Sequence, residues 1–304
     1  SGAGKSHTIK IIAARAHKKF QDAFFFFVDI ENEYIEFAKR LGFSVSMVES
    51  TTQLGMDPFN YLSADKAASL LAEILGVEQL VKYAMLEAAE EDCHSVEDLY
   101  QRVAELDKTN GTKYAPFLKI LKLGSINRLL AGKPTLAGST VIGLANSFAV
   151  NSEEHRLATR IALEYALHHA ISAVARETPK YIVLDEGWAL FKDESTGESV
   201  EELARRARKY NVTIILATQN IEDILKHPHA LTLFNNSDTK ILLQHKSTEK
   251  NSLVENLHVS DIEAEILIRA NKGEAMIHAS ENIIRCQFIA DEKELEMFNT
   301  NPNL

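Results

Sequence analysis

Cysteine is scarce in this sequence, and long hydrophobic runs are absent from it. Only Cys93 and Cys286 occur among the 304 residues, too few for a disulfide framework or a four-cysteine zinc site, which favours a reducing setting. No apolar run approaches the roughly 20 residues that a membrane-spanning helix needs. No secretory signal opens the chain, although a truncated start could hide one. We therefore expect a cytoplasmic protein.

Positively charged residues are fewer than negatively charged ones. Aspartate and glutamate number 43 against 33 lysines and arginines, so the net charge is −10. This balance does not indicate a general affinity for nucleic acid, while a local basic patch stays open. Histidine is more frequent, with 11 residues, but His168 and His169 have no third ligand at a recognisable spacing. We therefore predict no histidine-based metal site.

The first residues of the chain hold a recognisable motif. They read Ser-Gly-Ala-Gly-Lys-Ser, the second half of the phosphate-loop pattern G-x-x-x-x-G-K-[S/T]. Glycine lets backbone N–H groups converge on phosphate oxygens, the lysine reaches the β- and γ-phosphates, and the serine hydroxyl binds Mg²⁺. The first glycine of the pattern and the strand before it are missing, which predicts a core truncated at its amino terminus. The candidate ATP-binding residues are Gly2, Ala3, Gly4, Lys5, Ser6 and His7, with Ser6 also a ligand of Mg²⁺.

Strand-like and helix-like segments alternate along most of the chain. Continuous apolar runs predict buried strands, and apolar residues at helical spacing predict the helices between them. This alternation predicts an α/β fold with a mostly parallel sheet, flanked by helices on both faces, and a hairpin near the end. The predicted strands are 24–28, 44–48, 140–144, 181–184, 212–217, 240–244, 275–277 and 283–289, and the predicted helices are 7–20, 35–41, 157–174 and 200–210.

The pattern changes between residues 63 and 133. Apolar residues recur there at helical spacing, charged residues fill the gaps, and no strong strand pattern occurs. The length of the chain fits one large α/β domain or a domain with a sizeable insertion. We predict an all-helical insertion over residues 63–133, with 1–62 and 134–304 forming the core.

Two carboxylates follow the predicted strand 181–184, namely Asp185 and Glu186. Ligands of open α/β sheets bind at the carboxyl ends of the strands. An aspartate at this place can orient Mg²⁺, and the adjacent glutamate can polarise the water that attacks the γ-phosphate. The alternative is a solvated strand end with two ordinary carboxylates, which becomes less attractive beside the Gly-Lys-Ser motif.

Two further strand ends carry polar side chains that could reach the same site. Gln219 follows the predicted strand 212–217 and could contact the γ-phosphate or position water, although Thr218 or Asn220 could equally cap a helix there. Glu31 follows the first predicted strand and could reach the metal or water, with turn formation and helix capping as the alternative.

A cluster of cations in the predicted helix 200–210 offers a candidate for contact with a neighbouring subunit. Such a cluster is usually a solvated face, but NTPases that work as rings often place an arginine against the nucleotide of the next subunit. Arg205 and Arg208 share one face of the helix, and Arg269 is a separate candidate. We select Arg208.

Taken in order, these segments resemble the VirB4-type ATPases of type IV secretion systems, the TraC/TrbE group. Two departures from that family are Ile30 and Asn32, which stand where the family has proline and glycine, so the shape of this loop is open. The resemblance spans the chain from Ser1 to about Ile289. Its motifs are Asp29-Ile30-Glu31-Asn32-Glu33-Tyr34, Asp57-Pro58-Phe59-Asn60, Asp185-Glu186-Gly187-Trp188, Arg208-Lys209-Tyr210-Asn211, Thr218-Gln219-Asn220-Ile221-Glu222-Asp223 and Gly273-Glu274-Ala275.

The resemblance implies a RecA-like P-loop NTPase core that hydrolyses ATP with Mg²⁺ held by Ser6 and Asp185. It also implies a hexamer, at least transiently, that docks with other secretion-system subunits, including inner-membrane components, at the cytoplasmic face of the membrane. Glu186 would then activate water, while Gln219 and an arginine would report the nucleotide state to neighbouring subunits.

Two alternatives to a secretion ATPase stay open from the sequence. A DNA-translocating motor of the HerA/FtsK class would use the same site chemistry, but the acidic balance does not indicate DNA as a partner. A nucleotide-sensing scaffold without hydrolysis would have little need of a water-activating acid such as Glu186.

Overall fold

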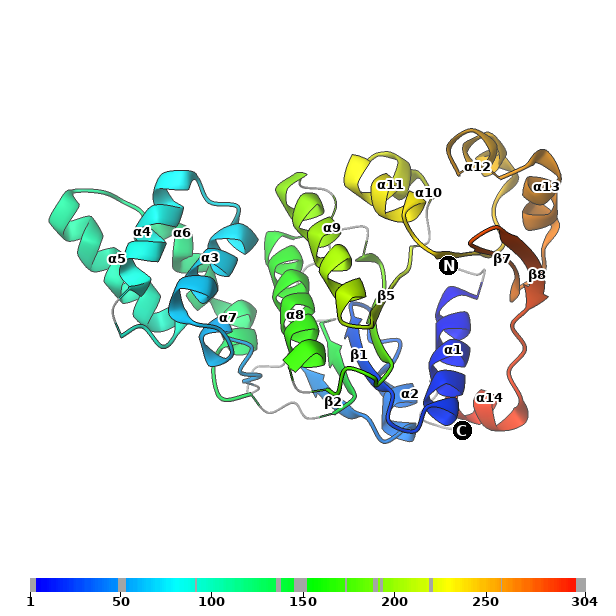
Figure 1. Ribbon diagram of the computed structural model, residues 1–304, viewed down its shortest axis with the longest axis horizontal. Helices are drawn as coiled ribbons and strands as arrows, with labels where there is room; N and C mark the ends of the chain where they lie inside the picture. The colour runs from blue at the N-terminus through cyan, green and yellow to red at the C-terminus, as the bar shows by residue number, and fades with distance from the viewer. Residues whose placement is uncertain are drawn as a thin grey trace.

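The computed structural model has an α/β core between two smaller structural regions (Figure 1). A helical region lies at one end of the long axis, and a small antiparallel sheet with short helices lies at the other. The structure describes residues 4–48, 53–90, 92–134, 138–144, 152–172, 174–187, 191, 194–218, 221–257 and 259–298.

The core contains a five-stranded parallel sheet in the order β2-β3-β1-β4-β5. Val28 of β1 stands opposite both Ile142 of β3 and Leu184 of β4. The residues that follow Val28 and Leu184, Asp29 and Asp185, therefore lie at the same edge of the sheet. The strands are β1 (Phe24–Asp29), β2 (Ser44–Met47), β3 (Thr140–Gly143), β4 (Lys180–Leu184) and β5 (Val212–Leu216).

The phenylalanine run of β1 is buried on both faces of the sheet because side chains alternate along a strand. Phe25 and Phe27 pack into a core with α1 (Lys5–Lys19), α2 (Ile35–Arg40) and α14 (Glu292–Phe298). Phe24 and Phe26 pack into the opposite core with α8 (Glu153–Ser172) and α9 (Glu194–Lys209). The fold expected from the sequence, a mostly parallel sheet with helices on both faces, is confirmed.

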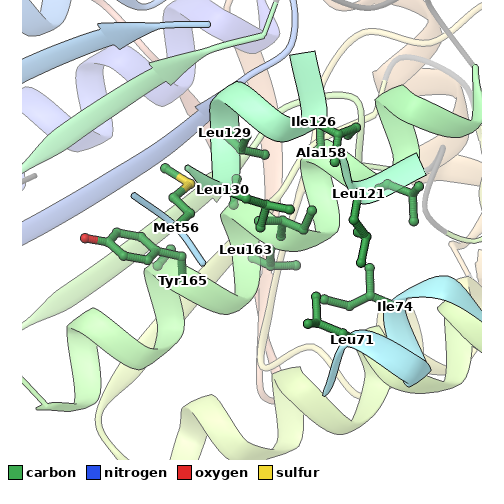
Figure 2. Packing of buried hydrophobic residues seen from close by; sticks show 14 of the residues in the cluster. Met56, Leu71, Ile74, Leu121, Ile126, Leu129, Leu130, Ala158, Leu163 and Tyr165 are labelled. Carbon is green, nitrogen blue, oxygen red and sulfur yellow. The ribbon is translucent and has the colours of Figure 1, made fainter. Parts of the chain in front are cut away.

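The helical region shares a hydrophobic core with α8. Leu71 and Ile74 belong to the same core as Leu163 and Tyr165 of α8 (Figure 2). Among the described residues, no strand lies between Met47 and Thr140. Because this core continues to the sheet, the division into a 63–133 insertion and a separate core stays a prediction. The region contains α3 (Ala64–Leu75), α4 (Gln79–Ala89), α5 (Val96–Asn110), α6 (Ala115–Leu118) and α7 (Gly124–Leu130), with the 3-10 helices η1 (Pro58–Asn60) and η2 (Lys119–Lys122).

The last three strands pair only with one another, in the antiparallel order β6-β7-β8, among the residues that the structure describes. The sequence predicted these strands and the final hairpin, but it did not show that they form a second sheet. Figure 1 places this sheet beside the start of α1. Its elements are β6 (Thr239–Leu242), β7 (Glu274–Ala279) and β8 (Asn282–Gln287), accompanied by α10 (Ile221–Leu225), α11 (Pro228–Asn235), α12 (Lys250–Leu257) and α13 (Asp261–Arg269).

Two helices begin four or more residues earlier than the sequence predicted, and α1 begins two residues earlier, at Lys5. Helix α8 begins at Glu153 rather than at Leu157, and α9 begins at Glu194 rather than at Val200. The first turns of α9 contain glycine, serine and threonine, which have low helix propensity. Gly197 is packed closely, because a Cβ atom there would lie 3.1 Å from the His229 side chain of α11. Tertiary packing therefore overrides local propensity at this end. Within the described part of the chain, no helix is long and apolar enough to cross a membrane.

Candidate nucleotide-binding site

Lys5 contacts the two carboxylates that the sequence predicted at the end of β4. Its Nζ donates hydrogen bonds to Oδ1 of Asp185 and Oε1 of Glu186, forming an ion pair with each. All three side chains are largely shielded, with exposed fractions of 14%, 2% and 14%. Burial lowers the pKa of Lys5, but the two carboxylates outweigh it and raise the pKa overall. The lysine of the phosphate-loop motif is therefore charged and lies at the end of β4.

The phosphate loop enters α1 through a left-handed glycine. Gly4 precedes the helix with φ 97°, a conformation that favours glycine. A Cβ atom at this position would lie 3.4 Å from the backbone nitrogen of Gly273 and 3.7 Å from Cγ of Lys272. The turn before β7 is therefore packed against the loop, and Lys272 is a cation near the site that sequence reasoning missed. The predicted residues Gly2 and Ala3 lie outside the described residues.

Ser6 and His7 lie in the first turn of α1. The start of a helix favours anions because its N–H groups point outward and the helix dipole is positive there. No acidic side chain occupies this turn. The His7 ring packs edge-on against Phe298, with 5.2 Å between ring centroids. Burial, then the positive charges of Lys272 and Lys10, lower the pKa of His7.

Asp185 and Glu186 differ in burial and in backbone shape. Asp185 is 1% exposed, and its Oδ1 also accepts the backbone N–H of Glu186 at 3.0 Å. Glu186 has φ 51°, a left-handed conformation that non-glycine residues rarely adopt outside turns and functional sites. This turn directs both side chains toward Lys5.

The loop after β1 contributes a residue that sequence reasoning did not select. Tyr34 is 1% exposed, and its hydroxyl donates to Oδ2 of Asp185 at 3.0 Å. Burial, followed by the negative charge of Asp185, raises the pKa of Tyr34, so the phenol stays protonated. The only sequence signal was its place in the segment Asp29 to Tyr34, next to a strand end.

The Asp29 carboxylate stabilises the backbone of this loop. This buried carboxylate accepts the backbone N–H groups of Glu33 at 3.0 Å and Tyr34 at 2.7 Å. Burial raises the pKa of Asp29 to about 6, although the two N–H bonds oppose the shift. Asn32, which replaces the family's glycine, has φ 58°. Asparagine is one of the few residues that tolerates this left-handed shape, so the substitution preserves a turn that glycine would also form.

Glu31 is exposed at the rim of the site. Burial, then the charges of Glu33 and Glu186, raise the pKa of Glu31. The influence of Glu186 indicates that the two side chains lie in the same electrostatic environment. The structure therefore leaves Glu31 near the site, and its predicted role toward metal or water stays a prediction.

The candidate arginines are engaged within their own chain. Arg208 donates to the backbone oxygen of Asn236 and lies 3.5 Å from the Asp238 carboxylate. Arg205 pairs with Glu201 at 2.9 Å. Arg269 lies 3.4 Å from the Glu265 carboxylate, and the two line a surface hollow of about 530 Å³ between α13 and β8. The predicted contact of Arg208 with a neighbouring subunit stays a prediction, and Gln219 lies outside the described residues.

The donor atoms at this site suit Mg²⁺. Magnesium prefers hard oxygen ligands and is commonly held by one or two protein groups together with phosphate oxygens. The Ser6 hydroxyl and the Asp185 carboxylate carry such oxygen atoms. Ser6 and Asp185 are the residues that would hold the ion, and this role stays a prediction.

Comparisons with known proteins concern the fold of the chain. Residues 162–297 match the family model of the TraG P-loop domain. The structure is similar to VirB4 of Thermoanaerobacter pseudethanolicus, with TM-score 0.78 and 21% identity, covering 97% of this chain and 89% of that one. No curated protein matched the sequence significantly.

The bacterial conjugative coupling protein TrwB is also similar in structure. TrwBdeltaN70 in its trigonal form with sulphate gives TM-score 0.69 at 10% identity, covering 96% of this chain and 83% of that one. TrwB in complex with ADP and Mg²⁺ gives TM-score 0.63 at 11% identity, covering 96% and 84%. The VirB4-type resemblance seen in the sequence is confirmed, and the chain has the α/β P-loop fold of the VirB4- and TraG-like ATPases.

Proposed function

We propose that this chain is the motor domain of an ATPase that hydrolyses ATP to ADP and phosphate and energises type IV secretion or conjugative transfer. The observation that carries the proposal is the meeting of Lys5 with Asp185 and Glu186, residues separated by 180 positions or more. A lysine from a phosphate loop beside two strand-end carboxylates is the combination that phosphoryl transfer requires. TrwB, which has the same fold, has been seen with ADP and Mg²⁺.

Each residue has a chemical role in this proposal. Lys5 exchanges its carboxylate partners for the β- and γ-phosphates, whose charge it neutralises. The first turn of α1, with Ser6 and His7, presents N–H groups to the phosphates. Glu186, released from Lys5, accepts a proton from the attacking water. Bound Mg²⁺ would supply positive charge to the phosphate oxygens, held by Ser6 and Asp185.

The assembly and location proposed for the chain rest on the resemblance to VirB4-type ATPases. We propose a hexamer, at least transiently, working with other secretion-system subunits at the cytoplasmic face of the membrane. Arg208 would act at the nucleotide of a neighbouring subunit, and Gln219 would contact the γ-phosphate or the attacking water and report the nucleotide state to neighbouring subunits. The intrachain contacts of Arg208 would then have to open when subunits assemble.

The test compares ATP binding and hydrolysis in the wild type with those in Glu186→Gln and Lys5→Ala. We expect Glu186→Gln to bind ATP within about twofold of the wild type and to lose turnover by about 100-fold or more, because a general base contributes about 10²–10⁴. Lys5→Ala should lose ATP binding. Glu281→Gln, an exposed glutamate in the turn between β7 and β8, is the matched control. Unchanged hydrolysis in Glu186→Gln would refute the assignment of the general base.

A second series measures the rate per protomer against protein concentration, with and without DNA. A rate that rises with concentration supports a site shared between subunits. No effect of DNA favours a secretion ATPase, whereas salt-dependent stimulation by DNA favours a DNA-translocating motor of the HerA/FtsK class. ATP binding without turnover under every condition would favour a nucleotide-sensing scaffold.

A further inference from the structure

A buried phenol binds one of the two residues that would hold Mg²⁺. The Tyr34 hydroxyl donates to Oδ2 of Asp185 at 3.0 Å. Tyr34 lies in the loop after β1, whereas Asp185 follows β4, so this contact depends on tertiary packing.

We propose that Tyr34 is a positioning residue for the Mg²⁺–ATP complex, which sets the orientation of Asp185. The inference rests on the proposed function, because it concerns the metal bound at that site. Tyr34 itself would contact neither the nucleotide nor the ion.

The two carboxylate oxygens of Asp185 have different hydrogen-bond partners. Oδ2 is bound by Tyr34, while Oδ1 is bound by Lys5 and by the backbone N–H of Glu186. When Lys5 turns to the phosphates, Oδ1 loses its ammonium partner and Oδ2 keeps its phenol. Tyr34 therefore determines which carboxylate oxygen faces the incoming cation.

Tyr34 is held rigidly enough to serve in this way. Its backbone N–H is bound by the Asp29 carboxylate at 2.7 Å, and its ring lies 5.2 Å from that of Phe27, between ring centroids. The Lys10 ammonium lies 5.6 Å from the Tyr34 ring centroid on the α1 side. A side chain fixed by backbone capping, ring packing and a nearby cation loses little further freedom when it orients Asp185.

The experiment is Tyr34→Phe, which removes the hydroxyl and retains the ring. ATP affinity is measured by calorimetry across a Mg²⁺ titration and again in EDTA. We expect the Mg²⁺ concentration for half-maximal ATP binding to rise about tenfold, in line with the loss of one hydrogen bond to a charged group. Affinity in EDTA should change less than about twofold, because Lys5 and the start of α1 still bind the phosphates.

The matched control is Tyr61→Phe. The Tyr61 hydroxyl is also buried, but it has no hydrogen-bond partner among the residues that the structure describes. This variant should keep the wild-type Mg²⁺ dependence. Thermal unfolding of both variants without nucleotide separates a positioning role from a general loss of structure.

Three results would overturn the inference. The first is a wild-type Mg²⁺ dependence in Tyr34→Phe. The second is an equal loss of ATP affinity with Mg²⁺ and in EDTA, which would assign Tyr34 to general site structure. The third is a wild type that binds no ATP, which would also remove the proposed function, whereas the first two leave that function standing.

Discussion

The edge of the sheet that holds the candidate nucleotide-binding site differs from the helical region in the role of its polar groups. At the sheet edge, charged groups such as Asp29, Lys10 and Asp185 are buried together. Two non-glycine residues there, Asn32 and Glu186, adopt left-handed backbone conformations. Both features cost free energy, and their concentration at one edge points to selection for function rather than for stability.

The helical region places its polar groups where they complete secondary structure. Ser95 caps α5 by accepting the N–H of Asp98 at 3.0 Å, and Gly76 and Gly111 provide left-handed ends for α3 and α5. Its interior is aliphatic and continuous with the core against α8 (Figure 2). We therefore expect mutations in the helical region to change stability. Mutations at the sheet edge should change ATP binding or the pH dependence of stability.

The largest effect on stability is expected from Leu71→Ala in α3. Leu71 is fully buried, so removing its side chain leaves a cavity and should lower the free energy of unfolding by about 3 kcal/mol. Chemical denaturation measures this change. ATP affinity, measured by calorimetry at a temperature where the variant is folded, should stay within about twofold of the wild type. A large loss of affinity would break the proposed separation of the two regions.

The pH dependence of stability should distinguish the sheet edge. The pKa of Asp29 is raised from 3.8 to about 6 in the folded protein, so folding favours the protonated form. Its stabilising contribution is therefore complete below about pH 3.8 and is lost as the pH rises through about 6. Relative to Asp29→Asn, the wild-type free energy of unfolding should fall by about 3 kcal/mol over this range.

Denaturation of both proteins between about pH 4.5 and 7.5 measures most of this difference. Asparagine keeps one acceptor oxygen, which replaces only one of the two carboxylate oxygens that bind the N–H groups of Glu33 and Tyr34, and it does not titrate. The prediction therefore concerns how the difference in stability between the two proteins changes with pH, and not its absolute size. Parallel stability curves for the two proteins would contradict the prediction.

A smaller effect is expected from Asp57→Ala. The buried Asp57 carboxylate accepts the N–H of Phe59 at 3.0 Å and that of Val96 at 2.8 Å, so it joins η1 to the start of α5. Its removal leaves both donors without this acceptor and should cost about 2 kcal/mol. Thermal denaturation should show the loss, with unchanged ATP affinity. The segment Asp57 to Asn60, part of the family resemblance, would then have a structural role.

The smallest effect is expected from Ser95→Ala, which removes the side-chain cap of α5. The cost should be about 1 kcal/mol, as is typical of helix caps. Ser95→Asp should restore most of it, because aspartate also caps helix starts well. If the alanine and aspartate variants are equally unstable, the cap does not support the helical region as described.

Much of the fold followed from local pattern. The apolar run at Phe24 to Val28 and the one before Asp185 are buried parallel strands, as predicted, because only buried strands tolerate such continuous hydrophobicity. The first turns of α9 escaped prediction because their packing against α11 outweighs their weak helix propensity. The separate antiparallel sheet was not predicted, because the sequence pattern of a strand does not show which other strand it pairs with.

The sequence by itself supplied the prediction of the site and of its chemistry. The types and order of Lys5, Asp185 and Glu186 indicated phosphoryl transfer, because motif spacing and strand-end position are local properties. Only the tertiary structure decided that Tyr34 binds Asp185 and that Lys272 lies beside Gly4. These contacts join residues far apart in the chain, and they depend on how α1, the β1 loop and the second sheet pack together.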